Sequence, residues 1–469
     1  MLLLLFACIA DPTGTLGDTA PATETPLASS RSESTPSGTT TAPTELGLPV
    51  IWSHDPVAAE RGGQLLLDGV GRPLIPRVAL RSLWAVWGGP PILDDGRYWE
   101  AFRDRYGLAE SPWPNDDYPV GLHAEGPEFA ALDCLACHTD VVAGTLVVGA
   151  GSSRFDLQAL IDDLIALGDV GEDLGLPPVV LPWAITDRTT AAGATDATGL
   201  GFELSLLYGP PGADIETVFG PQQPPAWWTL AYKRSAFVDG SGAADGHRTM
   251  AAMLLAFGLT WPELMAMDAE LEEMHQFLLS LRAPSWPFDP PDPAAVASGR
   301  AVFDATCAGC HGVHTGPDAA FPDTVVDVGT DPLRHTAFGP EEAAWMNAGW
   351  FGETHPVSDT EGYLAPPLLG VWATAPYFHA GSVPTLAAVL DPDARPAAWQ
   401  RTGAEADDYD PVAVGWRHTV ESTGAPMDTV EGRRIVDTTR AGLSAAGHRF
   451  GEDLSTDERT ELLAYLMTL

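Results

Sequence analysis

The sequence predicts a mainly α-helical protein with long Pro- and Gly-rich loops and little β-structure. Apolar residues recur at helical spacing in several segments, whereas strand-like alternation is sparse. The 469 residues include 42 prolines and 48 glycines, which separate these segments as loops. A chain of this length exceeds the usual size of one domain, so we expect two hydrophobic cores.

Three helices are expected between residues 48 and 285. Five apolar side chains form one stripe over residues 156–167, and Gly168 is the expected C-terminal cap. Further helices are expected over residues 250–257 and 269–281. Prolines then cluster at positions 287, 290, 291 and 293, which we interpret as a domain boundary.

The pattern Cys-x-x-Cys-His occurs twice, as CLACH at 134–138 and as CAGCH at 307–311. Thiols at i and i+3 lie on one side of a helical turn, and the histidine follows at once, so the three groups can converge beneath one flat ligand. In c-type haem attachment both cysteines form thioethers with the porphyrin edge and the histidine coordinates the iron. Two covalent haem c groups are therefore predicted, one held by Cys134, Cys137 and His138, the other by Cys307, Cys310 and His311.

Three other interpretations of the cysteine pairs are a zinc site built from both pairs, a thioredoxin-like redox pair and a structural disulfide. A redox pair does not require the trailing histidine, and a site of four thiolates does not require it twice. The repeated five-residue pattern therefore favours haem.

The predicted domains are a first haem domain at 48–290 and a cytochrome c domain at 291–469. In the second, a helix from Ala294 leads into the haem motif. The last segment has Ser455 and Glu458 at capping-box spacing, followed by an apolar helical face. A helix before the motif and a closing amphipathic helix are typical of cytochrome c.

The N-terminal region is predicted to direct export. Residues 1–10 resemble a bacterial lipoprotein signal, with Cys8 as the acylated residue, although no Lys or Arg precedes the apolar run. A cleaved signal or a misplaced start is the alternative. Residues 11–47 are rich in Ser, Thr and Pro and are predicted to be a disordered linker. We expect a periplasmic or extracellular protein, attached to a membrane at most through a lipid.

The net charge of −40 predicts a solvated acidic surface and excludes nucleic acid as an expected partner, because phosphates would be repelled. No run of eighteen or more apolar residues occurs, so no membrane-spanning helix is expected.

Four segments resemble the di-haem cytochrome c peroxidase superfamily, and its rubber oxygenase branch most closely. They are YLAPPLLGVWATAPYFHAGSVPTLAAVL at 363–390, LDCLACHTD around the first motif, PAWWTLAYKRSAFVDGSG at 225–242 and AGHRFGEDLSTDERTELLAYLMTL at the end. The resemblance implies one haem with an open position for peroxide or dioxygen and one six-coordinate haem for electron transfer. It also implies that His138 is the proximal ligand of the reactive haem, and that His311 and His448 are the proximal and distal ligands of the other.

Met427 and His379 are two further candidates for positions near the second haem. Met427 is an alternative sixth ligand, because a thioether also binds haem iron. It lies too far beyond His379 to match the methionine of the peroxidase branch, which favours the oxygenase branch. His379 is expected to be a structural histidine near the haem edge or the domain interface.

The remaining candidates come from the segment between the two motifs. The resemblance implies a tryptophan between the haems, and Trp227 or Trp228 could serve as an electron route or fill the core. Phe237 and His247 lie where the oxygenase branch builds its distal pocket. A phenyl ring would exclude water and a histidine could act as a general base. A structural or solvated role is the default for the other histidines: His54, His123, His275, His314, His335, His355 and His418.

The sequence thus predicts an exported di-haem oxidoreductase of peroxidase or dioxygenase type. Its expected partners are a small-molecule oxidant, an organic substrate and an electron donor, either a protein or a small redox carrier. The alternatives are a pure electron carrier with both irons six-coordinate and a haem-based sensor.

Overall fold

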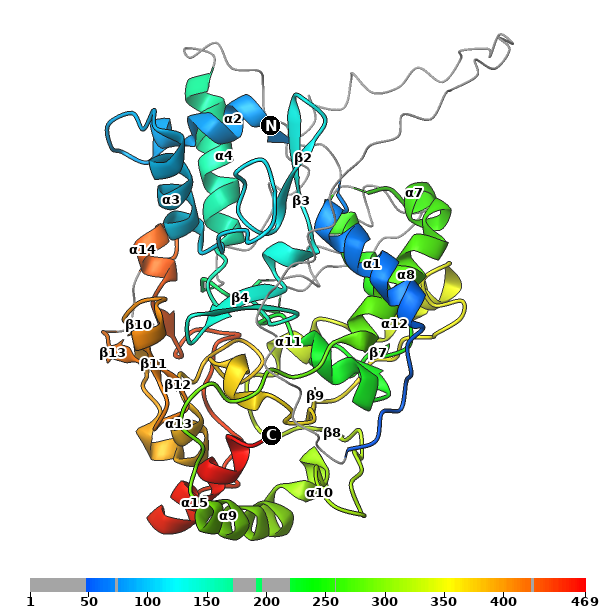
Figure 1. Ribbon diagram of the computed structural model, residues 1–469, viewed down its shortest axis with the longest axis vertical. Coiled ribbons are helices and arrows are strands. Elements are labelled where there is room, and N and C mark those ends of the chain that lie inside the picture. Colours follow the sequence, from blue (N-terminus) through cyan, green and yellow to red (C-terminus); the bar gives the residue numbers. More distant parts are fainter. Residues whose placement is uncertain (1–47, 72–74, 172–190, 196–219, 258, 423–425) are drawn as a thin grey trace. The chain divides into compact units, whose positions relative to one another are not determined.

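Helices and short loops dominate the computed structural model, which describes residues 48–71, 75–171, 191–195, 220–257, 259–422 and 426–469 (Figure 1). The predicted signal segment at 1–10, Cys8 and the linker at 11–47 lie outside these ranges. Within them, no helix is both long and apolar enough to cross a membrane.

The α-helices are mostly short. They are α1 (Pro56–Asp68), α2 (Arg77–Ser82), α3 (Asp95–Tyr106), α4 (Leu157–Gly171), α6 (His247–Ala251), α7 (Trp261–Ala266), α8 (Asp268–Ser280), α9 (Pro293–Thr306), α10 (Ala308–His311), α11 (Leu333–Thr336), α12 (Pro340–Ala348), α13 (Leu386–Leu390), α14 (Val430–Arg433) and α15 (Thr456–Leu466). Single 3₁₀ turns are η1 (Leu83–Val86), η2 (Cys134–Ala136), η3 (Trp227–Tyr232), η4 (Ala252–Phe257), η5 (Val371–Thr374), η6 (Pro392–Ala394) and η7 (Ala406–Asp408).

The strands are short and all paired antiparallel. They are β1 (Ile75–Pro76), β2 (Leu122–Glu125), β3 (Phe129–Leu132), β4 (Thr139–Val142), β5 (Thr145–Val148), β6 (Ser235–Ala236), β7 (Gly242–Ala243), β8 (Val325–Val326), β9 (Tyr363–Leu364), β10 (Ala398–Arg401), β11 (Tyr409–Asp410), β12 (Gly415–Trp416), β13 (His418–Val420) and β14 (Val436–Asp437). They form two three-stranded sheets, in the orders β1-β3-β2 and β13-β10-β14, and four two-stranded pairs. The mainly helical class predicted from the sequence is confirmed.

The predicted helices are present, with two differences. The helix expected at 156–167 is α4, but it continues to Gly171, so the prediction that Gly168 caps it is wrong. Gly168 keeps a helical backbone because no neighbour or turn forces it into the left-handed region. The segment at 250–257 begins as α6 and tightens into the 3₁₀ turn η4. The closing helix α15 has the predicted capping box of Ser455 and Glu458.

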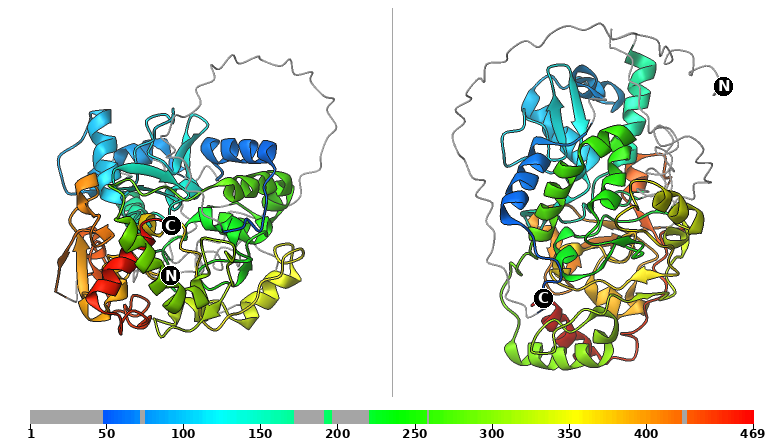
Figure 2. Two further views of the ribbon diagram at one scale, coloured as in Figure 1. Left: turned by 60° about the horizontal axis from the view of Figure 1, so that its bottom comes forward. Right: turned by 90° about the vertical axis from the view of Figure 1, so that its right-hand side faces the viewer.

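Two helix pairs join parts of the chain that are far apart in sequence. The N-terminal helix α1 packs along α8, and α9 packs along the closing helix α15 (Figures 1 and 2). In the second pair a Cβ atom at Gly299 would overlap the backbone carbonyl of Glu461. The absence of a side chain at Gly299 is therefore what allows the two helices to approach.

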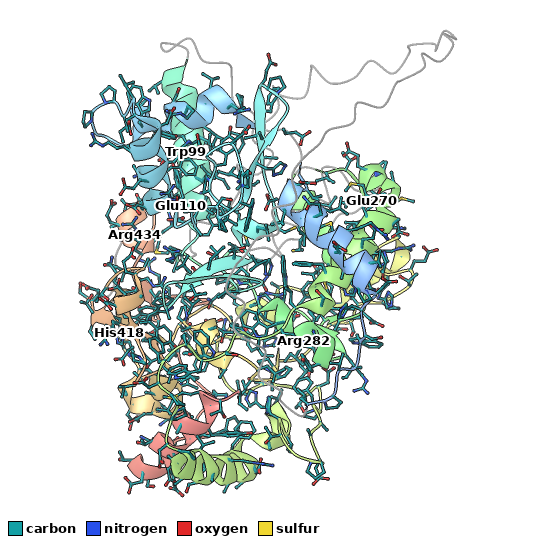
Figure 3. All side chains as sticks on the ribbon, in the orientation of Figure 1. Trp99, Glu110, Glu270, Arg282, His418 and Arg434 are labelled. Atoms are coloured by element: carbon teal, nitrogen blue, oxygen red, sulfur yellow. The ribbon has the colours of Figure 1, made fainter. Side chains whose placement is uncertain are left out.

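Two clusters of buried side chains form the interior. The first gathers side chains from α1 to α8, among them Trp99 (Figure 3), and the second centres on Phe303, Trp372 and Tyr465. Each cluster also takes residues from the other half of the chain: Phe338, Met346 and Phe351 pack in the first, and Val142 and Trp228 pack in the second. The domain limit at 290/291 stays a prediction, since the two cores share segments.

Charged side chains lie mostly outside these clusters, as the acidic composition predicts. Glu110 and Glu270, both labelled in Figure 3, are exposed. Some charged groups are buried as pairs. Arg433 binds Asp156 at 3.0 Å and so ties α14 to the start of α4. Removing one member of such a pair would leave an uncompensated buried charge.

We expect Gly299→Ala to lower the free energy of unfolding by about 1–3 kcal/mol, because the added methyl group forces α9 away from α15. Chemical denaturation followed by circular dichroism measures this. The matched control is Gly168→Ala, where a methyl group meets no atom within 4 Å. The control is expected to raise stability by up to about 1 kcal/mol, because alanine is the better helix former. Equal stability of the two variants would contradict the close approach of α9 and α15.

Candidate haem-binding sites

The first Cys-x-x-Cys-His motif is held by a short turn. In η2 the Asp133 side chain accepts a hydrogen bond from the Leu135 amide at 2.8 Å, and the Cys134 carbonyl accepts one from the His138 amide at 3.0 Å. This turn presents both thiols and the imidazole to one cavity. The predicted convergence of the three groups is therefore present.

The chemistry of these cysteines fits thioether formation better than metal–thiolate binding. Burial, and next the Asp133 carboxylate, raise the pKa of Cys137 to about 12 and raise that of Cys134 as well. A zinc site or a redox pair needs thiolates, whose formation this environment opposes. Cys134 and Cys137 pack against the first core, whereas Cys307 packs against the second. Among the described residues, no group of three or more His, Cys, Asp or Glu side chains is placed to hold a metal ion. The four motif cysteines form no disulfide.

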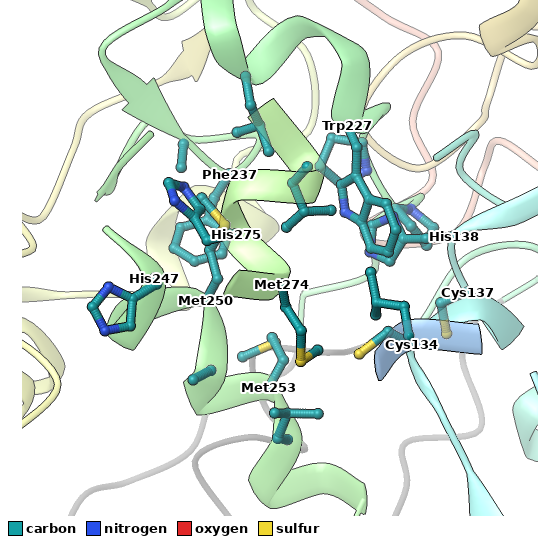
Figure 4. Close-up of a pocket in the computed structure, with 18 of the residues that line it drawn as sticks. Cys134, Cys137, His138, Trp227, Phe237, His247, Met250, Met253, Met274 and His275 are labelled. Atoms are coloured by element: carbon teal, nitrogen blue, oxygen red, sulfur yellow. The ribbon is translucent and has the colours of Figure 1, made fainter. Parts of the chain in front are cut away.

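The cavity beside the motif encloses about 190 Å³ and is lined mainly by apolar side chains. Figure 4 shows His138 and Trp227 on one side, with Phe237, Met250 and His275 on the opposite side. Met253 and Met274 also line it, and so does Lys233, whose pKa burial lowers to about 8. Such an interior suits a flat apolar macrocycle, and the Lys233 ammonium suits a haem carboxylate.

His138 has the features of a proximal iron ligand. Burial lowers its pKa to about 3, against a smaller opposite effect of the Pro225 backbone, so the ring is neutral and has a lone pair for iron. Its ring stacks on Trp227, with centroids 4.3 Å apart and planes 19° from parallel. Trp227 is held there because its amide donates to the Gly149 carbonyl at 2.8 Å, and the Gly149 amide donates to the His138 carbonyl at 2.8 Å.

The neighbouring tryptophans belong to different cores. Trp227 packs in the first, whereas Trp228 packs in the second and donates its indole hydrogen to the Leu369 carbonyl at 2.8 Å. Consecutive side chains thus pack into both cores. This arrangement is compatible with the predicted electron route as well as with a packing role.

Phe237 and His247 both line the cavity, but their environments differ. Phe237 places an apolar ring opposite His138 (Figure 4). His247 has both ring nitrogens 2.7 Å from carboxylates, those of Asp268 and Glu272. Although burial opposes it, these hydrogen bonds raise the pKa of His247. The geometry therefore argues against His247 as a base in the cavity and makes it a link between α6 and α8.

The second motif begins where α9 ends. Cys307 is the C-terminal cap of α9, and its carbonyl accepts from the His311 amide at 3.0 Å. Nδ1 of His311 lies 2.8 Å from the Pro366 carbonyl. A carbonyl only accepts, so Nδ1 carries the proton and Nε2 keeps the lone pair that an iron ligand needs.

His448 faces His311, as the resemblance implies. The two ring centroids are 6.2 Å apart. Two metal–imidazole bonds of about 2 Å, with the ring radii, separate ring centres by about 6 Å, so the spacing fits one iron held from both sides. Burial, and next the charge of His311, lower the pKa of His448 to about 4, which keeps the ring neutral. The structure thus brings together the two ligands predicted for the second haem.

Arg395 holds the loop that carries His448. Its guanidinium donates to the carbonyls of Ala445 and Gly447, both at 2.7 Å, and of His448 at 3.0 Å. It also binds the Ala388 and Val389 carbonyls at 3.1 and 2.9 Å, at the end of α13. His448 has a left-handed backbone with φ of 44°, which such a clamp stabilises.

The other predicted residues lie elsewhere. Nε2 of His379 is 3.2 Å from the Gly442 carbonyl, and its ring stacks on Tyr363 with centroids 4.5 Å apart. Met427 packs in a small apolar cluster with Trp399 and Leu443, whereas the ring that faces His311 is that of His448. The geometry agrees with a structural His379 and argues against Met427 as a ligand.

Sequence reasoning missed several cavity residues, namely Lys233, Met250, Met253, Met274 and His275. The helical spacing of Leu271, Met274, His275 and Leu278 is a signal that could have placed the last two on one face of α8. Nothing in that pattern shows that the face borders a cavity, because helix contacts set this.

We expect Arg395→Ala to loosen the His448 loop and turn part of the low-spin signal of the second haem into a high-spin one. Electron paramagnetic resonance and optical spectra of the ferric protein measure this. The control is Arg449→Ala, which removes a half-exposed arginine of the same loop that pairs with Glu452. If the Arg395 variant kept an unaltered low-spin signal, the clamp would be refuted.

Two family models match the C-terminal part of the chain. Residues 296–356 match the model described as cytochrome c, and residues 362–400 match the one described as RoxA-like, cytochrome c-like.

Among curated proteins, the uncharacterized protein y4iM of Sinorhizobium fredii is 29% identical over 256 residues, 48% of this chain and 56% of that protein. The uncharacterized protein y4iJ of the same organism is 28% identical over 259 residues, 40% of this chain and 41% of that protein. The chain thus spans about half the length of these relatives. Among solved structures, hydrazine synthase of Kuenenia stuttgartiensis, pressurized with xenon, covers 61% of this chain and 85% of its own at 15% identity and a TM-score of 0.27. A likeness at this level supports no conclusion.

Proposed function

We propose that this chain, whose residues 296–400 carry a haem-binding cytochrome c domain of the RoxA-like type, is an exported di-haem c-type oxidoreductase. In this proposal the haem at His138 meets a small oxidant, either peroxide or dioxygen, and the haem at His311 transfers electrons. An organic substrate and an electron donor complete the reaction.

The observation that supports this division is the difference between the two sites. His311 faces a second imidazole at a spacing that fills both sides of an iron. His138 faces a cavity whose far side presents Phe237, Met250 and His275 (Figure 4). In this proposal the first iron would have one side open to a small molecule, whereas imidazoles would occupy both sides of the second.

Haem c, when bound, supplies the iron at which an oxidant can be activated. The chain contributes the rest. His138 offers a neutral nitrogen to the iron, and Phe237 and the methionines exclude water from the cavity. Trp227 and Trp228 are consecutive residues that connect the two cores. His311 and His448 would hold the second iron low-spin, which suits electron transfer because no ligand has to leave.

Export is proposed because covalent c-type haem is generally assembled outside the bacterial cytoplasm. The apolar N-terminal run and Cys8 support a lipid anchor as part of the same proposal.

A second function is favoured by one observation. Met250, Met253 and Met274 all line the cavity, and a thioether is a known haem ligand. If one of them binds the first iron permanently, the chain is a pure electron carrier.

We expect the purified protein to contain two haems and, after reduction, to bind one carbon monoxide for each pair of haems. Mass spectrometry counts the haems, and optical titration with carbon monoxide counts the open irons. Two low-spin haems without carbon monoxide binding would refute the reactive site and establish the electron carrier.

We expect His448→Ala to convert the second haem to high spin while both haems stay attached, because the cysteines and His311 are untouched. The first haem provides the internal control, since its spectrum should not change. A second haem that stays low-spin would assign its sixth ligand to another residue, and Met427→Ala would then be compared.

A further inference from the structure

The chain contains a single lysine, and it lies inside the protein. The 24 residues that are Lys or Arg comprise 23 arginines and one lysine, Lys233. Lys233 is only 3% exposed and lines the cavity beside His138. An ammonium is a more compact charge than a guanidinium, and its pKa responds more readily to burial. The one position with this chemistry is thus in the wall of the proposed haem site.

The backbone of Lys233 is held by its neighbours. Its amide donates to the Leu230 carbonyl at 3.4 Å, where η3 ends, and its carbonyl accepts from the Trp52 indole at 2.8 Å. Both bonds use main-chain atoms of Lys233, so the ammonium itself takes no part in them.

The Nζ atom of Lys233 is open to the cavity. No hydrogen bond or ion pair joins it to a residue in the described part of the chain. It is nevertheless not one of the side-chain nitrogens there that are both closed off and without a partner. Part of its surface is therefore accessible. Because the residue as a whole is buried, the cavity that it lines is the space to which Nζ is open.

The acidic residue that acts on Lys233 is Asp323, and it is engaged elsewhere. Its carboxylate accepts from the amides of Arg234 and Ser235 at 3.0 and 3.2 Å, and from the Ser235 hydroxyl at 2.5 Å. Burial lowers the pKa of Lys233 to about 8, and Asp323 opposes this only in part. The side chain is still mostly charged at neutral pH, and a buried charge without a bonded partner costs free energy. An anion in the cavity would reduce that cost.

The other basic residues of the cavity wall do not offer such a charge. Burial lowers the pKa of both His138 and His275, so these rings are neutral at pH 7. Any charge on His247 is balanced by the two carboxylates that it contacts. Among the described residues that line the cavity, Lys233 is thus the positive group left for an anion.

We propose that Lys233 binds a carboxylate in this cavity. An ammonium donates strong, charge-assisted hydrogen bonds to a carboxylate, and its single charge balances a carboxylate better than a phosphate dianion. The carboxylate has two possible sources. One is a propionate side chain of the haem that Cys134 and Cys137 would attach, and the other is an organic substrate with an apolar body, which the apolar walls would surround. This inference rests on haem attachment at the first motif, as proposed above, and not on the reactivity of that haem.

The haem source is tested by resonance Raman spectroscopy of the ferric protein, because the bending mode of a haem propionate shifts when a hydrogen bond to it is lost. Lys233→Met removes the ammonium but keeps a flexible side chain. We expect the propionate band of the first haem to shift in this variant. The band of the second haem should stay in place and serves as the internal reference.

The substrate source is tested by optical titration with octanoate and octanamide, which share an apolar tail and differ in the charge of the head group. If the carboxylate belongs to a ligand, octanoate changes the spectrum of the first haem at a concentration at least about 10-fold lower than octanamide does. This is the scale of a hydrogen bond to a charged group. Lys233→Met should remove the difference.

The matched control is Arg234→Met, which removes the exposed cation next to Lys233 that does not line the cavity. Both measurements should give the values of the unaltered protein. An equal change in this control would show a general charge effect and would overturn the proposal. Lys233→Gln keeps the length and polarity of the side chain without its charge, and it decides if Lys233→Met fails to fold.

Each result has one meaning. A shifted propionate band assigns the carboxylate to the haem, and a preference for octanoate that depends on Lys233 assigns it to a ligand. If removing the charge at Lys233 alters neither measurement, the carboxylate site is refuted. A first haem that binds no carbon monoxide would refute the reactive site alone, because the propionate band does not depend on it.

Discussion

The backbone hydrogen bonds that join His138, Gly149 and Trp227 are the constraint on which the first site depends. The Gly149 amide donates to the His138 carbonyl, and the Gly149 carbonyl accepts from the Trp227 amide. These two hydrogen bonds fix the backbone of Trp227 relative to that of His138, although the two residues are far apart in sequence. Gly149 has a φ of 89°, and an added Cβ atom would meet the side chains of Leu281 and Trp227. Only glycine fits without strain here, and its close approach is what places the indole on the imidazole.

The two Cys-x-x-Cys-His motifs form similar local turns, but different residues lie opposite them. In both motifs the histidine amide donates to the carbonyl of the first cysteine at 3.0 Å, so the backbone of the two turns is closed in the same way. The difference comes from what the rest of the chain places opposite. A clamped loop brings an imidazole to His311, whereas the residue after β6 and the helices α6 and α8 bring Phe237, Met250 and His275 to the side opposite His138. The proposed division of labour thus depends on tertiary packing around two similar turns.

Charged residues near the two sites have local structural roles. The acidic surface is solvated, while the described cations near the sites act locally: Arg395 holds carbonyls of the His448 loop, and His247 is held between two carboxylates. His247 thereby links α6 to α8 in the cavity wall, and His275 on α8 is held through Nε2 by the Ala244 carbonyl at 2.9 Å.

The sequence by itself determined the two Cys-x-x-Cys-His turns, the mainly helical class and the helices α8, α9 and α15, and its resemblance to a known family pointed to His448 as the residue opposite His311. These follow from short-range rules, namely residue spacing within one turn and helical periodicity, or from a motif that keeps its order along the chain. Only the tertiary structure decided that Trp227 and Trp228 enter different cores, that His247 is bound by carboxylates and that His275 borders the cavity. Such facts depend on which helix faces meet across more than a hundred residues, and periodicity shows that a face is apolar without showing what it packs against.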